Sequence, residues 1–298
     1  MKVVVTGATG LVGRAAISTF AAKGANVVGL TRAKLDISDE SAVREILGAQ
    51  QPDVVVNCAA WTDVDGCEAD NDRAFRTNAL GPELLARACR DSGSLLITIS
   101  TDYVFDGARD GFYTQRDQPN PQSVYARSKL EGEQRAQTAC ARTVVVRSAY
   151  IFGESGRNFL CTFLDSVRAG KQVKAINDAW GTPTYAPHLA ARLYELATRD
   201  LPGLYHVVNA GEGASFAEFV DQALEIGGLD RSLAQAVSMD SLRRPAPRPR
   251  NSRLRCLLSE AIGLPPMPLW LDALREHVNG TSGASKSQTK LICGETRL

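Results

Sequence analysis

The stretch MKVVVTGATGLVG, residues 1–13, carries the pattern that decides the fold. A short apolar run, VVV, is followed by glycines at positions 7, 10 and 13. A strand that runs through a glycine turn into a helix lets a pyrophosphate approach backbone amides at the helix N-terminus. The pattern predicts a dinucleotide site formed by Gly7, Thr9, Gly10, Leu11, Val12 and Gly13. Such glycines also close strand-to-helix turns that bind no ligand, which is the alternative.

Predicted strands and helices alternate along the chain after this stretch. Continuous Val/Ile/Leu runs suit parallel strands that are covered on both faces. These runs are VVGL near residue 28, DVVVNCAA near 55, LLITIS near 97 and TVVVRSA near 145. Segments of helical length and periodicity lie between them, for example Gly13–Lys23, Ser41–Gln50 and Phe75–Asp91. The order predicts an α/β protein with a Rossmann-type doubly wound parallel sheet.

The rhythm loosens after Ala149, which predicts a second, smaller domain. We expect residues 1–149 to form the nucleotide-binding domain, completed by about 186–209, where the run GLYHVVNAG at 203–211 returns to the sheet. Residues 150–281, rich in Gly- and Pro-containing loops, are expected to form mainly a C-terminal α/β substrate-binding domain. Residues 282–298 are polar and small and lack a clear period, which predicts a flexible tail.

Composition narrows the class of partner. The 298 residues are 44% hydrophobic and 22% charged with a net charge of +1, so nothing draws the chain to nucleic acid or to a membrane surface, and a small-molecule ligand is favoured. No uncharged run has membrane-spanning length, and Thr6 and Gly7 interrupt the first apolar run, so no signal peptide is expected. Seven cysteines without CxxC spacing predict reduced thiols in a cytoplasmic protein, and the three scattered histidines are interpreted as structural.

The end of the second predicted strand bears on the choice of cofactor. Thr31 and Arg32 stand where a ribose-binding carboxylate is usual, and an arginine there can pair with a 2′-phosphate. This favours NADP(H) over NAD(H), with a solvated Arg32 as the alternative. Asp36 and Ile37 are then candidates for contacts near the adenine.

A third cluster of candidate residues surrounds Tyr125. Tyr125 and Lys129 are four residues apart in VYARSKLEGE, so a helix would place them on one face. The fourth predicted strand ends in ISTDYVFDG, which places Ser100, Thr101 and Asp102 at the carboxyl edge of the sheet, where ligands of open α/β folds bind. A tyrosine has a pKa of ~10, and an ammonium group nearby lowers it. Tyr125 is therefore predicted to transfer a proton, with Thr101 holding the substrate oxygen. A tyrosine packed at a helix start beside a solvated lysine is the structural alternative.

With these residues in place, the chain resembles the extended short-chain dehydrogenase/reductases and, within them, the dTDP-4-dehydrorhamnose reductases, from residue 1 to about 280. GATGLVG and VYARSKLEGE mark the superfamily. The segments more specific to the reductases are TDVD, STDYVFDG, GRNF, GTPT and RPRNSRL.

The resemblance implies a reaction and a set of residues. NADPH, with NADH as an alternative, would deliver hydride to the C4 ketone of a nucleotide-linked 4-keto-6-deoxysugar, and dTDP-4-dehydro-L-rhamnose or a related deoxysugar is the implied substrate. The implied catalytic residues are Thr101, Tyr125 and Lys129. Further implied cofactor contacts are Cys58, Ala59, Ala60, Asn78 and Ser100. The implied substrate contacts are Thr62, Asp63, Thr101, Asp102, Tyr150, Asn158, Arg248 and Asn251.

Some positions depart from the pattern of these relatives. Related 4,6-dehydratases carry an Asp-Glu pair after the threonine, whereas this chain has Asp102 and Tyr103. Elimination lacks one carboxylate here, so simple reduction is favoured. Departures on the sugar side put the identity of the sugar in doubt; they are Trp61, Asp63, Gly66, Gln115 and Tyr150.

Two other functions stay open. The regulatory subunit of methionine adenosyltransferase resembles the same reductases, so a non-catalytic NADP-binding protein is one alternative. An NAD-dependent nucleotide-sugar epimerase is the other. No metal site is predicted, because no carboxylate cluster is apparent in the sequence, and a homodimer is the alternative to a monomer.

Overall fold

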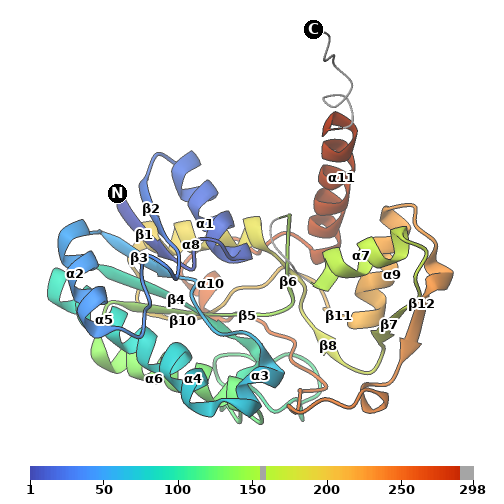
Figure 1. Cartoon of the computed structure of the whole chain (residues 1–298), viewed down its shortest axis with the longest axis horizontal. Helices are drawn as coiled ribbons and strands as arrows, with labels where there is room; N and C mark the ends of the chain where they lie inside the picture. The colour runs from blue at the N-terminus through green and yellow to red at the C-terminus, as the bar shows by residue number, and fades with distance from the viewer. Residues whose placement is uncertain (155–158, 289–298) are drawn as a thin grey trace, which may run out of the picture.

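The computed structural model describes the backbone of residues 1–154 and 159–288, and the side chains of these residues up to position 280. The larger lobe contains a six-stranded parallel sheet with the strand order β10-β5-β4-β3-β1-β2 (Figure 1). Its strands are β1 (Lys2–Thr6), β2 (Asn26–Leu30), β3 (Val54–Asn57), β4 (Leu95–Thr101), β5 (Thr143–Ser148) and β10 (Gly203–His206). The predicted doubly wound sheet is confirmed, and the run near residue 204 lies beside β5 as its edge strand.

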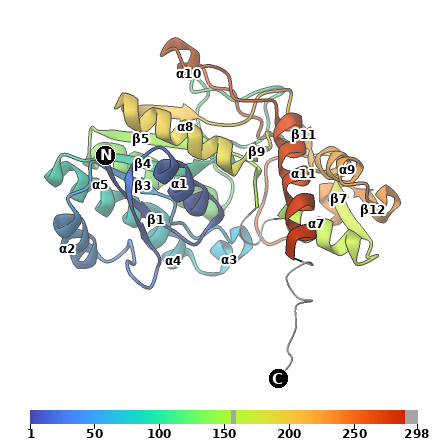
Figure 2. The ribbon, with the colours of Figure 1, turned by 90° about the horizontal axis from the view of Figure 1, so that it is seen from above.

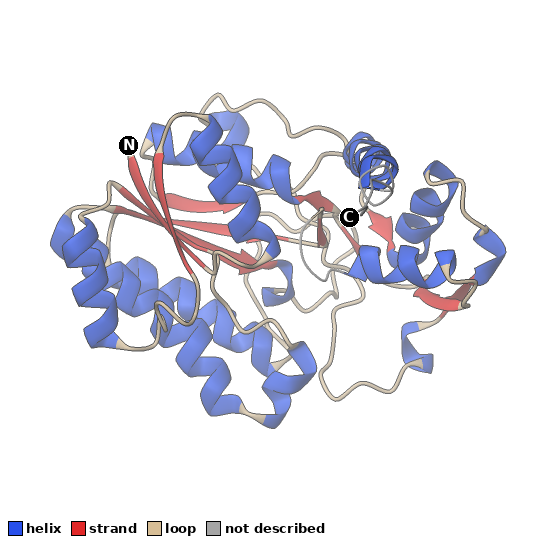
Figure 3. Cartoon of the chain, turned by 45° about the horizontal axis from the view of Figure 1, so that its top comes forward, coloured by secondary structure: helices blue, strands red, loops and turns tan. Residues whose placement is uncertain are grey.

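Alternating side chains of the strands bury both faces of this sheet. Val3 and Val5 join the core under one pair of helices, α1 (Leu11–Ala22) and α8 (Ala186–Arg199). Val4 points the other way, into the core under α2, α5 and α6. Figure 3 shows helices covering both sides of the sheet. The helices on this second side are α2 (Glu40–Gln50), α3 (Val64–Ala69), α4 (Asn71–Phe75), α5 (Gly81–Ser92) and α6 (Val124–Ala139).

The segment expected to be one helix, Phe75–Asp91, is divided. Its first part continues α4 into a π-helical turn, η1 (Arg76–Leu80), and α5 begins only at Gly81. Pro82 stands in the first turn of α5, where its missing N–H costs nothing. A π turn shifts the side chains that follow it and is often found at functional sites. Here it carries Asn78 toward the segment after β3.

The smaller lobe lies beside the carboxyl ends of the strands (Figure 2). Its core packs Phe152, Phe219 and Leu274 against one another. Its short strands pair as β6 (Ile151–Phe152) with β9 (Thr184–Tyr185), β7 (Val173–Ile176) with β12 (Ala234–Val237), and β8 (Trp180–Gly181) with β11 (Ala214–Ser215). Its helices are α7 (Phe159–Arg168), α9 (Phe216–Ile226) and α11 (Trp270–Gln288), and its 3₁₀ turns are η3 (Arg231–Leu233) and η4 (Met239–Ser241). The short helix α10 (Leu258–Ala261) lies near α8 of the larger lobe (Figure 2), and the 3₁₀ turn η2 (Asp102–Val104) follows β4.

Helix α11 reaches into the segment expected to be a tail. Residues 282–288 continue this helix, while residues 289–298 lie outside the described part of the chain. The prediction of a tail therefore applies only to residues beyond the end of α11.

Candidate active site

The glycine turn between β1 and α1 is shaped by close backbone contacts. Gly7 has a φ of +65°, and a Cβ there would lie 2.7 Å from the backbone of Cys58 after β3. A Cβ at Gly13 would overlap the carbonyl oxygen of Gly7. Gly10 is the N-cap of α1, whose first turn has no acidic residue. The free amides at the start of α1 therefore face the carboxyl edge of the sheet, where an anion is favoured.

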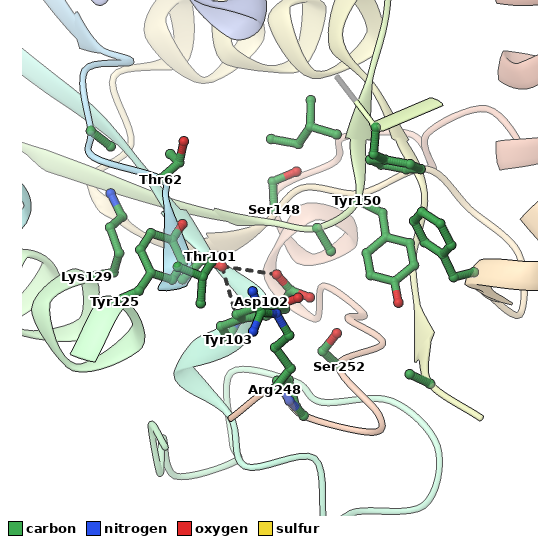
Figure 4. Close-up of a pocket in the computed structure, with 18 of the residues that line it drawn as sticks. Thr62, Thr101, Asp102, Tyr103, Tyr125, Lys129, Ser148, Tyr150, Arg248 and Ser252 are labelled. Atoms are coloured by element: carbon green, nitrogen blue, oxygen red, sulfur yellow. Dashed lines mark hydrogen bonds between the residues drawn. The ribbon is translucent and has the colours of Figure 1, made fainter. Parts of the chain in front are cut away.

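Thr101 is the last residue of β4, and its hydroxyl is held by local hydrogen bonds. It donates to Asp102 Oδ1 at 3.1 Å and accepts from the backbone N–H of Tyr103 at 3.2 Å. Figure 4 shows Thr101 beside Tyr125 of α6. The ring of Tyr103 lies edge-on to the ring of Tyr125, with 6.2 Å between the ring centroids. The two elements that carry the predicted trio thus meet at the edge of the sheet.

Helix α6 begins where the sequence predicts. The hydroxyl of Ser123 accepts from the backbone N–H of Ala126, and Glu68 Oε1 accepts from that of Val124 at 2.8 Å. These two caps fix the first turn, which carries Tyr125. One turn later, Lys129 is buried, and its Nζ donates to the carbonyl of Ile99 in β4 at 2.7 Å.

A cavity of about 960 Å³ runs from the glycine turn to the small lobe. This volume lies at the upper end of the range for sites that take a cofactor and a substrate. Thirteen of the predicted site residues line it: Gly10, Leu11, Val12, Cys58, Ala60, Thr62, Ser100, Thr101, Asp102, Tyr125, Lys129, Tyr150 and Arg248.

Burial changes the acidity of the groups at the centre of this cavity. It raises the pKa of Tyr125 well above its usual range, and the Thr101 hydroxyl opposes that rise. The lowered pKa expected from the nearby ammonium of Lys129 is therefore wrong for this state of the site, because burial outweighs the attraction of the charge. It lowers the pKa of Lys129 to about 8, against the opposing charge of Glu133. It also raises the pKa of Asp102 to about 6. Oδ2 of Asp102 is buried and has no hydrogen-bond partner among the described residues.

Other predicted residues lie outside the lining of the cavity; they are Gly7, Thr9, Gly13, Arg32, Asp36, Ile37, Ala59, Asp63, Asn78 and Asn251. Arg32 follows β2 with 72% of its side chain exposed, 3.6 Å from the Asp36 carboxylate. Asn78 is buried, and its Oδ1 accepts from the backbone N–H of Trp61 at 2.8 Å. Asn251 donates to the carbonyls of Arg109 and Gly111. Its amide group is thereby committed to the backbone. Asn158 lies outside the described residues.

Arg248 lines the cavity, yet its guanidinium already has a partner. Nη1 and Nη2 donate to the two carboxylate oxygens of Asp65 in α3, at 2.9 and 2.8 Å. Nη1 also donates to the carbonyl of Ala246. In this state the guanidinium of Arg248 is bound to Asp65, so its two nitrogens are not free to bind a diphosphate.

The small-lobe end of the cavity includes residues that the sequence analysis missed. Lys174 of β7 and Arg244, both exposed, line it together with the side chains of Phe163 and Phe216. Phe159 and Phe163 are four residues apart in α7, a spacing that predicts one shared face. No comparable local signal marks Lys174 or Arg244, because their place at the cavity depends on the packing of the whole lobe.

Other predictions from composition can be compared with the structure. Cys58, Cys67, Cys89, Cys140 and Cys256 are free thiols. Within the part of the chain that the structure describes, no group of three or more His, Cys, Asp or Glu side chains could hold a metal ion. A search of the same residues finds no helix with both the length and the apolar character needed to cross a membrane.

The combination of a glycine turn after the first parallel strand with a Tyr-x-x-x-Lys helix facing a strand-end threonine defines a short-chain dehydrogenase/reductase. The family described as "RmlD substrate binding domain" matches residues 1–282, and the chain belongs to it. The resemblance found in the sequence is therefore confirmed.

Individual relatives agree with this placement. The dTDP-4-dehydrorhamnose reductase of Mycolicibacterium smegmatis is 38% identical over 290 residues, which cover 95% of this chain and 87% of that protein. A crystal structure of a dTDP-4-dehydrorhamnose reductase from Clostridium acetobutylicum superposes with a TM-score of 0.91 at 33% identity, covering 95% of this chain and all of the other. A Bacillus anthracis dTDP-4-dehydrorhamnose reductase in complex with NADP also has a TM-score of 0.91, at 29% identity, covering 94% and 99% of the two chains.

The residues present fit NADP(H) as the cofactor. The amides at the start of α1 suit a pyrophosphate, and the glycines at positions 7 and 13 let the turn pack closely against β3 and α1. Arg32 stands exposed where a 2′-phosphate would be read. Lys129 lines the same cavity as Gly10 of this turn and Tyr125.

Proposed function

We propose that the protein catalyses the NADPH-dependent reduction of the C4 ketone of a dTDP-4-keto-6-deoxyhexose, with dTDP-4-dehydro-L-rhamnose as the first candidate. The observation that carries the proposal is the convergence of Thr101, Tyr125 and Lys129 on one wall of a cavity that extends into both lobes. NADPH supplies the hydride in this reaction. Relatives over nearly the whole chain bear the name of this reductase, which favours it over the regulatory and epimerase alternatives.

Tyr125 is the proposed proton donor. Because burial raises its pKa, the phenol is protonated at neutral pH, which is the state that a ketone reduction requires at the start. As negative charge develops on the C4 oxygen, the phenol proton moves to it. The ammonium of Lys129, one turn away on the same face of α6, stabilises the phenolate that remains.

Thr101 and Asp102 are proposed to orient the sugar. The Thr101 hydroxyl lies beside the Tyr125 phenol and can donate to the same substrate oxygen. The unpartnered Oδ2 of Asp102 can accept from a sugar hydroxyl. Tyr150 and Thr62 line the space on either side of this pair.

The cofactor is proposed to lie along the glycine turn. The amides of Gly10 to Val12 would bind its pyrophosphate, and Arg32 its 2′-phosphate. Asp36 and Ile37 would contact the adenosine. Lys129 would donate to the nicotinamide ribose while it supports Tyr125.

The small-lobe end of the cavity is proposed to take the nucleotide of the substrate. Lys174 and Arg244 bring two exposed cations to this end, which suits a diphosphate. Phe163 and Phe216 offer ring faces to a base. Arg248 can join the diphosphate only if its fork turns from Asp65.

The direct test follows nicotinamide absorbance while the keto sugar is generated in place from dTDP-glucose by a dehydratase and an epimerase. We expect NADPH to be consumed, NADH more slowly, and neither by Tyr125→Phe. Binding of NADPH to Tyr125→Phe, followed by fluorescence, is the control for an intact site. If the native protein bound NADPH but did not consume it with this keto sugar, the proposed substrate would be wrong. Other nucleotide sugars would then be tested.

Location and assembly are separate proposals. The free thiols and the small-molecule site favour the cytoplasm. A homodimer stays a prediction, and light scattering on the purified protein with and without NADPH would decide it.

A further inference from the structure

A buried ion pair lies directly behind the candidate active site. Glu133 of α6 and Arg147 of β5 have side chains that are 3% and 4% exposed. Arg147 Nη2 donates to Glu133 Oε2 at 2.7 Å, and Arg147 Nε donates to Oε1 at 3.0 Å. Such a pair contributes little stability compared with apolar side chains of the same volume, because both charges lose their hydration. Stability alone therefore does not account for it.

The carboxylate of Glu133 also holds the end of β4. Ser100 Oγ donates to Glu133 Oε1 at 2.5 Å. Ser100 lies opposite Arg147 in the β4–β5 ladder and immediately precedes Thr101. Glu133 thereby receives bonds from both strands that end beneath the cavity.

One face of α6 connects this carboxylate to the catalytic candidates. Tyr125, Lys129 and Glu133 follow one another at intervals of four residues, so they share that face. Lys129 Nζ donates to the carbonyl of Ile99. Three consecutive residues of β4, from Ile99 to Thr101, are thus placed against these three side chains of α6.

We propose that Glu133 is a positioning residue for the reduction: held by Arg147, its carboxylate fixes the end of β4 against α6 and keeps the ammonium of Lys129 charged. Its effect on the rate rests on the proposed function, whereas its effect on Lys129 does not. Burial lowers the pKa of Lys129 to about 8, and Glu133 is the first of two groups that raise it in opposition. The other group is the Cys58 thiol, whose own pKa burial raises to about 12, so it carries little charge near neutral pH.

The test is the dissociation constant of NADPH as a function of pH, measured by fluorescence. Binding should weaken as Lys129 loses its proton, and Lys129→Met should abolish this dependence, which assigns the titrating group. We expect the double variant Glu133→Met, Arg147→Met to fold, because no buried charge is left without a partner. The midpoint of its binding curve, which is the pH at which the loss of NADPH affinity is half complete, should fall by about one pH unit. The reason is that the carboxylate that favours the charged lysine is gone.

A second pair on the same helix provides the matched control. Arg135 and Glu83 join α6 to α5 at 3.0 Å, on the side away from the cavity. The variant Glu83→Met, Arg135→Met removes the same two residue types, and its NADPH midpoint should equal that of the native protein. An equal shift in both double variants would overturn the proposal, because the effect would then come from any weakened tether of α6.

Two single variants keep the proposal falsifiable if the double variant does not fold. Glu133→Asp keeps the charge and should hold the midpoint near the native value, while Glu133→Gln should lower it. Ser100→Ala removes the bond to Glu133 but keeps the Glu133 charge, and because Ser100 is also a predicted cofactor contact, its readout is kcat for the keto sugar at saturating NADPH, which should fall several-fold. An unchanged midpoint in Glu133→Gln, or in the folded double variant, would overturn the charge role. An unchanged kcat in Ser100→Ala would show that the bond between Glu133 and β4 does not position the site.

A native protein that binds NADPH but reduces no keto sugar would contradict the proposed function. The comparison of pH midpoints would then still test the effect of Glu133 on Lys129.

Discussion

At the scale of single residues, the buried carboxyl of Asp102 lowers the stability of the folded protein at neutral pH and keeps one oxygen without a hydrogen-bond partner in the protein. Its carboxyl is buried with one oxygen unpartnered, and its pKa is raised to about 6 from an ordinary value of ~3.9. The folded state then binds a proton more tightly than the unfolded state, so stability falls as pH rises from about 4 to about 6 and stays lower above that. We expect Asp102→Asn to be more stable than the native protein at neutral pH by up to about 3 kcal/mol, and to lose turnover. Urea unfolding between about pH 4 and 8 would measure the gap.

Asp178 is the control, because its pKa is shifted in the direction opposite to that of Asp102. Hydrogen bonds from Ser238 and the backbone N–H of Met239, with Arg250, lower its pKa to about 2. Its contribution to stability is present above ~3.9 and is lost as pH falls toward about 2. Asp178→Asn should therefore destabilise the protein at neutral pH. If both variants changed stability in the same direction, the account of Asp102 by burial would be wrong.

Arg32 carries the prediction on cofactor choice. Its exposed guanidinium has only a loose contact with Asp36, so it is free to pair with a 2′-phosphate. We expect Arg32→Ala to weaken NADPH binding about tenfold or more, while NADH binding changes little. Lys34→Ala, a cation removed from the same exposed loop, is the matched control. Equal losses for the two cofactors would contradict the assignment.

At the scale of elements, the sequence predicts structure best where a local signal sets a boundary. Ser123 caps α6 next to Tyr125, and the fourth strand ends at Thr101, within the Ser100–Asp102 segment expected at the carboxyl edge. The π turn at Asn78 could not be predicted, because its side chain is held by Trp61 and Ser128, which are distant in the sequence. The same is true of Glu133. Its role depends on the register of β4 and β5.

The turn between β1 and α1 gives a prediction for an element. A Cβ at Gly13 would overlap the Gly7 carbonyl, so Gly13→Ala should push α1 away from the turn. We expect a loss of NADPH affinity together with a loss of stability of about 1–3 kcal/mol. Gly48→Ala is the control, because that helical position in α2 has open space around it, and alanine there should add up to about 1 kcal/mol. Thermal unfolding and NADPH titration of both variants would measure these effects. Unchanged affinity in Gly13→Ala would mean that the turn tolerates the shift.

At the scale of the whole molecule, the cavity depends on how two lobes are held together. The sequence places the glycine turn, Thr101 and Tyr125 at one edge of the sheet, because parallel strands end at a common edge. It could not place Lys174 or Arg244, which reach the cavity only through the packing of the small lobe. The substrate contact predicted for Arg248 stays a prediction: the residue lines the cavity, and its side chain pairs with Asp65.

This pair gives the prediction at the largest scale. Arg248 lies on the segment that leads from η4 of the small lobe back to the larger lobe, where the backbone of Arg250 accepts from Trp180, while Asp65 belongs to α3 of the larger lobe. The Asp65 carboxylate is 37% exposed, so the coupling energy should be about 1 kcal/mol rather than that of a fully buried pair. We expect Arg248→Ala and Asp65→Asn to raise KM for the nucleotide sugar severalfold with little effect on NADPH binding, because the cofactor contacts lie in the larger lobe alone. A double-mutant cycle on KM and on stability would measure the coupling.

Arg250→Ala is the control. It breaks a pair with Asp178 on the same segment and should leave KM nearly unchanged. If Asp65→Asn instead lowered KM, then Asp65 would be competing with the substrate diphosphate for Arg248, and substrate binding would require that the guanidinium change partners.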